Sequence, residues 1–313
     1  MRWFVIVNPT SGSKKGLSDI PLIIKLLRES GIVFDIAFTE RKYHATELVV
    51  GAVNSSYRHI IVVGGDGTLH EVVNGLFIQK KIPAVDVTLA VIAAGTGNDW
   101  IRMYGIPATY TDAIKAIVAG KTFKQDVGKV SYYESRVHQV RYMANMAGMG
   151  FDAYVNKQYN NLKEKGIYSG WLYIISMMKA IFSYFSGDYT ITIDGKKAWS
   201  GRMFTAAIGI GKYNGGGMRQ TPEAISNDGL FDLTIIRRMS NIGILFHIKL
   251  LYNGLIYKLP QSLHLRGHNV EITSKWRSTI EVDGEALGEA PFTFETIPEA
   301  ITVIVGESFN VNL

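Results

Sequence analysis

Residues 1–120 alternate short apolar runs with segments of helical period, and this alternation restricts the fold more than any other feature. Each run has the length of a buried strand, and the segments between have apolar residues three and four positions apart. The expected strands are Trp3–Val7, Val33–Phe38, Ile60–Val63 and Val87–Ala93, and the expected helices are Ile20–Ser30, Ala45–Ser55, Leu69–Gln79 and Thr111–Ala119. Apolar strands that alternate with helices indicate a parallel sheet covered by helices on both faces.

From about Asp126 the chain is rich in strand patterns instead. Asp194-Gly195 and Asp283-Gly284 are turn dipeptides of the hairpin type. The expected strands are Tyr189–Ile193, Met203–Ile210, Phe231–Ile236, Leu263–Leu265, Val270–Thr273, Thr279–Val282, Phe292–Glu295 and Ile301–Val305. We therefore expect two closely packed domains, an α/β domain over residues 1–125 and an antiparallel β-rich sandwich or barrel over residues 126–300.

Two apolar segments interrupt the β-rich half. Ile167–Phe185 has 19 residues and is nearly long enough to span a bilayer. Its serines and tyrosines, together with Lys179, favour a buried or interfacial helix over a membrane span. In Ile242–Leu259, apolar residues alternate with polar ones such as His247 and Lys249, which predicts an amphipathic helix.

Composition excludes several kinds of site. The chain has no cysteine, which excludes disulfides, a thiolate nucleophile and cysteine-ligated metals and fits a reducing cytoplasm. The net charge of +6 favours anionic partners such as nucleotides or acidic membranes. There is no dense basic stripe with interleaved aromatic residues, so we expect no nucleic-acid partner. The first apolar run ends at Asn8-Pro9, which is too early for a signal peptide.

A glycine-rich loop, Gly64-Gly65-Asp66-Gly67-Thr68, follows the third expected strand. Its glycines would let backbone N–H groups approach a phosphate chain, although the same residues also suit a tight turn. Thr68 and Glu71 have the spacing of a capping box, which predicts a helix N-terminus directed at the loop. Asp66 would repel phosphates unless a cation or a hydroxyl lay beside it, so it indicates a magnesium–nucleotide or an acceptor hydroxyl.

The other three strand ends carry comparable groups. Asn8–Gly12 follows the first strand, Thr39 the second, and Gly95-Thr96-Gly97-Asn98-Asp99 the fourth. Asn98 or Asp99 could instead simply cap the next helix, and Asn8–Gly16 lacks the spacing of a Walker A loop. Because the carboxyl ends of parallel strands meet at one edge, the four loops are suited to a single polyphosphate.

With these loops in view, the sequence resembles the diacylglycerol kinase catalytic-domain family, which includes sphingosine and ceramide kinases and bacterial soluble lipid kinases. The matching motifs occur in order over nearly the whole chain, which makes them more specific than any single loop. They are Asn8–Gly12, Gly64–Thr68 with Glu71 and Asn74-Gly75, Gly95–Asp99, Gly150–Asp152, Gly211–Met218, Asn227–Leu230 and Asp283–Glu285.

The resemblance implies a phosphotransferase that acts on an alcohol group. It would transfer the γ-phosphate of ATP to the hydroxyl of a diacylglycerol or sphingoid-type lipid, with ATP and Mg²⁺ as cofactors. The implied fold is a nucleotide-binding α/β domain followed by a β-sandwich-like lipid domain, and residues 301–313 are candidates to return to the first domain. The implied partners are a lipid substrate and the membrane surface, to which a cytoplasmic enzyme would bind peripherally. An edge strand of the β-rich half could pair two subunits as a homodimer.

The resemblance also assigns roles to residues of this chain. Asp66 would lie between the γ-phosphate and the lipid hydroxyl, and Glu285 or Asp283 would be the general base, with Glu285 slightly favoured. Without the family context, this pair would be an ordinary hairpin tip. The implied nucleotide contacts are Asn8, Pro9, Thr10, Ser11, Gly12, Thr39, Gly64, Gly65, Asp66, Gly67, Thr68, Leu69, His70, Glu71 and Thr96.

Further implied positions lie in the second half. Asp99 and Asp126 would belong to a water network beside the cleft, and Asp152 to the substrate side. Asp228, with the carbonyl groups of Ile225 and Leu230, matches a structural magnesium site.

Two rival interpretations remain at this point. One is a catalytically silent nucleotide- or lipid-binding regulatory protein, against which the intact acids Asp66, Asp283 and Glu285 argue. The other is an enzyme similar to NAD kinase, which shares the glycine-glycine-aspartate loop. The second glycine loop and the large apolar helices argue against it.

Overall fold

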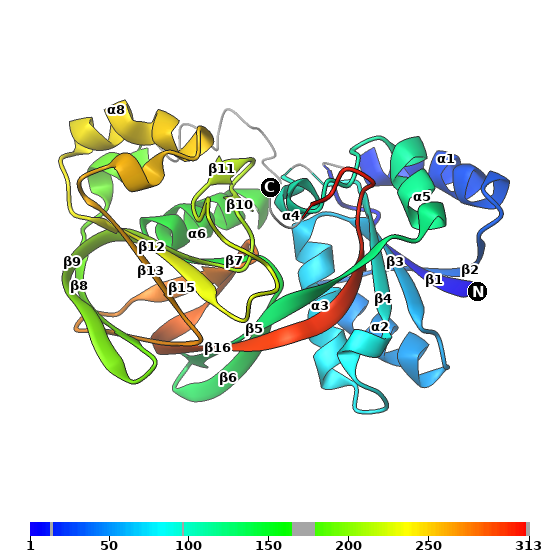
Figure 1. Ribbon diagram of the computed structural model, residues 1–313, viewed down its shortest axis with the longest axis horizontal. Helices are drawn as coiled ribbons and strands as arrows, with labels where there is room; N and C mark the ends of the chain where they lie inside the picture. Colours follow the sequence, from blue (N-terminus) through cyan, green and yellow to red (C-terminus); the bar gives the residue numbers. More distant parts are fainter. Residues whose placement is uncertain (13–14, 96, 165–178, 311–313) are drawn as a thin grey trace.

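The computed structural model describes residues 1–12, 15–95, 97–164 and 179–310. Thr96, most of the apolar stretch Ile167–Phe185 and the last three residues of 301–313 lie outside this part of the chain. The two halves expected from the sequence lie side by side, with the helix-rich half at the right and the strand-rich half at the left of Figure 1.

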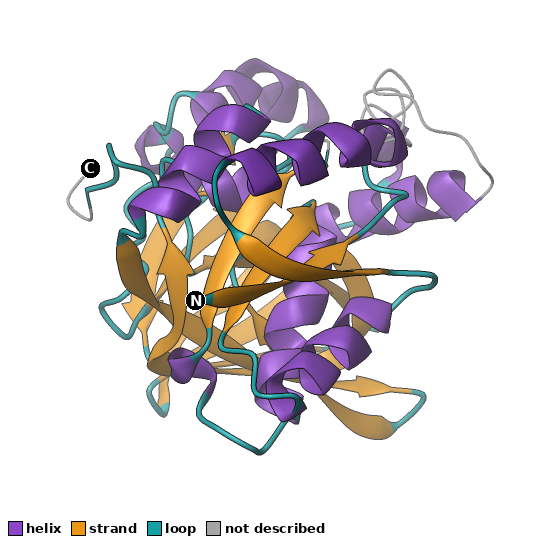
Figure 2. Ribbon diagram, turned by 90° about the vertical axis from the view of Figure 1, so that its right-hand side faces the viewer, coloured by secondary structure: helices purple, strands orange, loops and turns teal. Residues whose placement is uncertain are grey.

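The first half is a parallel sheet in the order β4-β3-β1-β2. Its strands are β1 (Arg2–Val7), β2 (Val33–Phe38), β3 (His59–Gly64) and β4 (Thr88–Ala93), and its helices are α1 (Lys15–Glu29), α2 (His44–Asn54), α3 (Asp66–Ile78), η1 (Ala84–Asp86), α4 (Asp99–Met103) and α5 (Tyr110–Ala119). Alternate strand residues pack on opposite faces: Ile60 and Val62 contact α2 and α3, whereas Ile61 and Val63 contact α1 and α5. Helices therefore cover both faces of the sheet (Figure 2).

The second half is antiparallel. Its strands are β5 (Thr122–Glu134), β6 (Val137–Met143), β7 (Met146–Gly150), β8 (Gly187–Ile193), β9 (Lys196–Gly209), β10 (Tyr213–Asn214), β11 (Met218–Arg219), β12 (Phe231–Arg237), β13 (Ser262–Gly267), β14 (Asn269–Ser274), β15 (Thr279–Val282) and β16 (Glu285–Ile304), and its helices are α6 (Phe151–Glu164), α8 (Asn241–Tyr252) and η2 (Ile256–Lys258). Pairing runs from β9 through β7, β15, β16, β14 and β8 back to β9, which closes a ring. Phe231, Phe292 and Phe294 are buried in its core.

Strand β16 connects the two halves. The sequence pattern predicts separate strands at Phe292–Glu295 and Ile301–Val305, but the structure has one strand of 20 residues. Its end pairs in parallel with β4 at Thr302 and Val303, while most of its length pairs with β5. As a result, β5 and β16 run together from one half into the other (Figure 1), and the main sheet is continuous over 14 strands.

The segment Ile242–Leu259 differs from the single amphipathic helix expected. Helix α8 ends at Tyr252, Gly254 follows with φ of +69°, and the short η2 completes the segment. Ile244 and Leu251 pack inward against α6, but Ile242 is 64% exposed and Phe246 is 79% exposed. Helix α8 is therefore apolar on both faces. Within the described part of the chain, every helix is too short or too polar to cross a membrane.

Candidate active site

The loops after β1, β3 and β4 touch one another. Asn8 Nδ2 donates a hydrogen bond of 2.9 Å to Thr68 Oγ1, which joins the first loop to the glycine loop. A Cβ atom on Gly95 would lie 2.6 Å from the Cα atom of Gly65, so these two loops pack backbone to backbone. The N–H of Thr39 donates to the carbonyl of Val7, which places Thr39 at the same sheet edge. In their described parts, the strand-end loops that the sequence assigns to a phosphate site thus lie at one edge of the sheet.

Asp66 connects the glycine loop to α4. Its carboxylate accepts hydrogen bonds from the backbone N–H groups of Asp99 at 3.1 Å and Trp100 at 3.2 Å. Burial, and secondly the charge of Asp99, raises the pKa of Asp66 to about 6. Asn98 is the N-cap residue of α4, but its side chain makes no capping hydrogen bond. Asp66, which is distant in sequence, accepts the N–H bonds of the first turn instead and so caps α4.

The capping box predicted from Thr68 and Glu71 is wrong. Helix α3 begins at Asp66 with Gly65 as its N-cap, so Thr68 lies inside the first turn. Glu71 instead accepts hydrogen bonds from the N–H groups of Tyr43 and Ala45 at 2.9 and 3.1 Å, and in this way it holds the start of α2. Leu69 is buried in the core, so its side chain faces away from the loop.

The second half closes over the site through Asp99. The buried carboxylate of Asp99 accepts hydrogen bonds from the N–H groups of Gly216 at 2.7 Å and Gly217 at 2.6 Å. Both glycines have positive φ, which other residues adopt only with strain. The glycine-rich turn Gly211–Met218 is thereby held against α4, in the first half.

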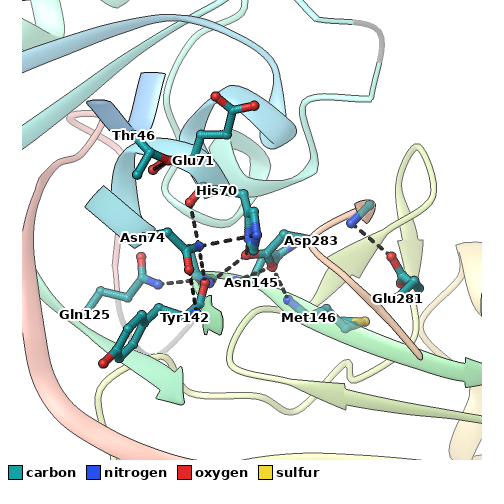
Figure 3. Close-up of polar contacts among 12 residues, drawn as sticks. Thr46, His70, Glu71, Asn74, Gln125, Tyr142, Asn145, Met146, Glu281 and Asp283 are labelled. Atoms are coloured by element: carbon teal, nitrogen blue, oxygen red, sulfur yellow. Dashed lines mark hydrogen bonds and ion pairs between the residues drawn. The ribbon is translucent and has the colours of Figure 1, made fainter. Parts of the chain in front are cut away.

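The acids of the Asp283-Gly284-Glu285 turn have different surroundings. Asp283 is 7% exposed, and its carboxylate accepts hydrogen bonds from the backbone N–H groups of Ala144, Asn145 and Met146 at 2.8, 2.9 and 3.0 Å. It also contacts Nδ1 of the buried His70 at 3.0 Å (Figure 3). These four contacts occupy the carboxylate, and the His70 side chain faces Asp283.

Glu285 lies against the glycine loop, at the start of α3. A methyl group on Gly67 would lie 3.6 Å from Glu285 Oε1. Glu285 Oε2 lies 2.6 Å from Lys42 Nζ, and the Glu285 side chain is 25% exposed. Glu285 is therefore the acid of the turn that lies beside the N-terminus of α3, where a phosphate is expected.

Among the residues expected to hold a structural magnesium, the carboxylate of Asp228 already has two partners. The N–H of Leu230 donates to Asp228 Oδ1 at 3.0 Å, and the guanidinium of Arg266 pairs with Asp228 Oδ2. The single carboxylate of the expected donor set is thus already neutralised by Arg266. Asp126 accepts hydrogen bonds from the N–H groups of Gly229 and Glu299, both at 2.7 Å, and stabilises this loop. Among the described residues there is no group of three acidic or histidine side chains that could hold a metal.

Two cavities lie next to residues of the candidate site. One of about 750 Å³ lies beside the first and fourth loops, against Gly12, Gly95 and Asn98. The other, of about 150 Å³, lies in the second half between α6 and α8. Its wall is mostly apolar, with Phe151 and Phe204 among its residues, and its polar groups are Asp152, Asn156, Thr205, Asn214, Gln220, Thr234, His247 and Glu281.

Asp152 and Glu281 are the acids of the apolar cavity. Gln220 Nε2 donates to Asp152 at 2.9 Å, and burial raises the Asp152 pKa to about 6. Glu281 is 2% exposed, and burial, then the neighbouring Asp152, raises its pKa to about 8. Glu281 was not expected from the sequence to belong to the site. The signal that could have found it is a glutamate inside the apolar strand Thr279–Val282.

Comparisons with known proteins identify the family of this chain. Residues 2–130 match the diacylglycerol kinase catalytic domain, and residues 145–305 match the YegS C-terminal NAD kinase beta sandwich-like domain. The chain is 30% identical over 311 residues to a diacylglycerol kinase of Staphylococcus epidermidis, covering 99% of this chain and 94% of that protein. The chain belongs to the diacylglycerol kinase family. The chain is therefore a kinase, and its family is one of lipid kinases.

Solved structures show the same two-domain fold in this family. A diacylglycerol kinase from Bacillus anthracis superposes with a TM-score of 0.72 at 22% identity, covering 98% of this chain and 97% of that one. An NAD kinase from Archaeoglobus fulgidus, solved in complex with ATP, gives a TM-score of 0.52 at 13% identity over 98% of this chain and 94% of that one. The kinase fold is thus shared with NAD kinase.

Proposed function

We propose that this kinase transfers the γ-phosphate of MgATP to the hydroxyl of a diacylglycerol or sphingoid-type lipid. The observation that carries the proposal is the position of the Asp283-Gly284-Glu285 turn. On one side of the turn, Glu285 lies beside Gly67 of the glycine loop. On the other, Asn156, which lines the apolar cavity, donates a hydrogen bond to the carbonyl of Gly284. An acid between a phosphate loop and an apolar cavity is what transfer to a lipid requires.

The nucleotide would lie along the edge of the parallel sheet. The cavity of about 750 Å³ beside Gly12 and Gly95 has room for it. Backbone N–H groups at the start of α3 favour a phosphate, as helix N-termini do. An NAD kinase of the same fold was solved with ATP, which supports this choice of nucleotide. The proposed contacts come from Asn8–Gly12, Thr39, Gly64–Thr68 and Thr96.

In the proposed reaction the lipid hydroxyl oxygen attacks the γ-phosphorus. Glu285 accepts the hydroxyl proton, the bond between the γ-phosphorus and its bridging oxygen breaks, and ADP leaves. Lys42, now paired with Glu285 Oε2 at 2.6 Å, would hold the carboxylate in place. Asp283 holds the turn rather than taking the proton, because its carboxylate already accepts three backbone N–H bonds. Positioning and charge neutralisation supply most of the rate in such transfers.

The lipid would enter from a membrane surface at α8. Ile244 and Leu251 of α8 line the apolar cavity, while Ile242 and Phe246 are exposed on the helix. Phe182 and Phe185 are also exposed, at 62% and 91%. Clustered exposed apolar side chains favour contact with a membrane or a partner, and we propose that these four form one such surface. Lys249 on α8 and Lys258 on η2 would each add about 1 kcal/mol to the free energy of binding at an anionic leaflet. We therefore propose that the protein associates peripherally with the membrane. We also propose that residues 126–300 form the lipid-binding domain and residues 1–125 the nucleotide-binding domain.

Labelled ATP, Mg²⁺ and a panel of lipids in mixed micelles test the proposal. The panel contains diacylglycerol, a sphingoid base and ceramide. We expect one class to become labelled by the wild-type protein. A protein that binds ATP but labels no lipid of the panel would contradict the proposal and favour a binding protein.

A further inference from the structure

The backbone beside Glu285 is held from two directions. The N–H of Gly284 donates to Glu281 Oε2 at 2.9 Å, and the carbonyl oxygen of Gly284 accepts from Asn156 Nδ2 at 3.0 Å. That carbonyl belongs to the peptide bond that Gly284 shares with Glu285. The orientation of Glu285 thus depends on one side chain of β15 and one of α6.

The same two side chains line the apolar cavity, together with Asp152. Glu281 has little freedom to move there. A Cβ atom on Gly148 would lie 2.8 Å from Glu281 Oε1 and 2.9 Å from the Cβ of Asp152, so only a glycine leaves room for both acids. Asn214 Nδ2 also donates to Glu281 Oε1 at 3.2 Å, which ties Glu281 to the glycine-rich turn.

We propose that Glu281 and Asn156 are positioning residues that couple occupancy of the apolar cavity to the orientation of Glu285. The inference rests on the proposed function, in which Glu285 is the base and the cavity takes the lipid. A lipid head group seated against Glu281 and Asn156 restricts the side chains that hold the Gly284 peptide. Glu285 is then held in its working orientation when substrate is present. Small displacements of a reacting group are costly, since about 1 Å of misplacement can lower a rate roughly 100-fold.

Asp152 provides a matched control. It lines the same cavity and is partly buried, but its carboxylate accepts a hydrogen bond from Gln220 rather than from the turn. If the cavity acids served only to bind lipid, Glu281 and Asp152 variants would have similar effects. If Glu281 positions the base, the two variants would affect different kinetic constants.

The experiment measures kcat and the two KM values for lipid phosphorylation, with the lipid that the wild-type protein labels. We expect Glu281→Ala and Asn156→Ala to lower kcat by about 10- to 100-fold with little change in KM for ATP or lipid. Glu281→Gln keeps an oxygen that can accept the Gly284 N–H, so its kcat is expected between those of wild type and Glu281→Ala. Asp152→Asn is expected to raise the lipid KM and retain kcat.

The alternatives are distinguishable. Wild-type kcat in both alanine variants, or an effect confined to the lipid KM, would overturn the inference while leaving the proposed function intact. A wild-type protein that labels no lipid would overturn the proposed function and the inference with it. Thermal unfolding is recorded for each variant; should Glu281→Ala not fold, the half-buried Asn156 carries the test through Asn156→Ala.

Discussion

His70 Nδ1 lies 3.0 Å from Asp283 Oδ2, although 213 residues separate the two in sequence. The contact joins α3 of the first half to the turn after β15. Asn74, one helical turn further along α3, exchanges two hydrogen bonds of 2.9 Å with the backbone of Tyr142. Together these contacts fix the glycine loop relative to the β-rich half (Figure 3).

Removing the Asp283 carboxylate should destabilise the whole chain. Asp283→Ala leaves three buried N–H groups without their acceptor, and each such group costs about 1–3 kcal/mol. We expect the free energy of unfolding to fall by at least about 3 kcal/mol in urea denaturation. Asp194→Ala is the control, because Asp194 has the same φ of 49° in an Asp-Gly turn but is exposed. Equal losses in the two variants would contradict this account.

Two helical glycines should respond oppositely to alanine. A Cβ on Gly75 would lie 2.2 Å from Val49 Cγ1 and 2.7 Å from the carbonyl oxygen of Thr46, so α2 and α3 would have to move apart. We expect Gly75→Ala to lower the free energy of unfolding by about 1–3 kcal/mol. Gly51 in α2 has open space around it, and Gly51→Ala should raise stability by about 0.5–1 kcal/mol. Stabilisation by Gly75→Ala would refute the close packing of α2 and α3.

Glu281 should make stability depend on pH. Burial, and then the charge of Asp152, raises its pKa from 4.5 to about 8, with Asp283 adding to the shift. Between these values the folded protein holds a proton that the unfolded chain releases, so stability falls as pH rises from 4.5 to about 8. Asp152, on α6, acts in the same direction up to about pH 6.

Glu281→Gln removes the Glu281 contribution. We expect its stability relative to wild type to increase with pH across that window, in urea denaturation at several pH values. Glu289→Gln, at an exposed ion pair with Arg277, should keep the wild-type slope. Parallel pH profiles for wild type and Glu281→Gln would show that Glu281 is ionised throughout.

The protein without nucleotide should not need magnesium for stability. Arg266 already neutralises Asp228 and also contacts the buried Asp232 at 3.1 Å. We expect EDTA to leave the thermal midpoint of the wild type unchanged. Arg266→Ala removes this partner from both acids, but Asp232 keeps His264 at 2.8 Å, so we expect the free energy of unfolding to fall by about 1–3 kcal/mol. A marked fall in the wild-type midpoint on chelation would indicate a bound structural metal.

The sequence predicted the first half well because local patterns decide it. Val33–Phe38 was expected and observed with the same bounds, even though Asp35 interrupts its apolar residues, because Gly31 ends the preceding helix and Thr39 follows the strand. The same patterns failed where distant parts of the chain decide the structure. Met146–Gly150 has no β-branched residue, yet it forms the central strand β7 because β9 and β15 pair with it.

For the site, the sequence indicated which residues gather but not how each side chain is used. Glu71 suited a local capping box, but the start of α2 offers it two N–H groups from a different loop. In the sequence, Asp283 and Glu285 are two acids of one turn motif, and the motif alone does not distinguish their roles. Only the fold shows that one faces the backbone of β7 and the other the glycine loop. Spacing along the chain carries no information on such contacts.

The most direct test of the central claim is the kcat of Glu285→Gln for transfer of labelled phosphate from ATP to lipid. Glu289→Gln, on the same strand, is the matched control. We expect Glu285→Gln to lower kcat by about 100- to 10,000-fold, with ATP affinity unchanged and Glu289→Gln as active as wild type. Phosphate transfer by Glu285→Gln at the wild-type rate would contradict the account, because no base would then be needed beside the glycine loop at Gly67.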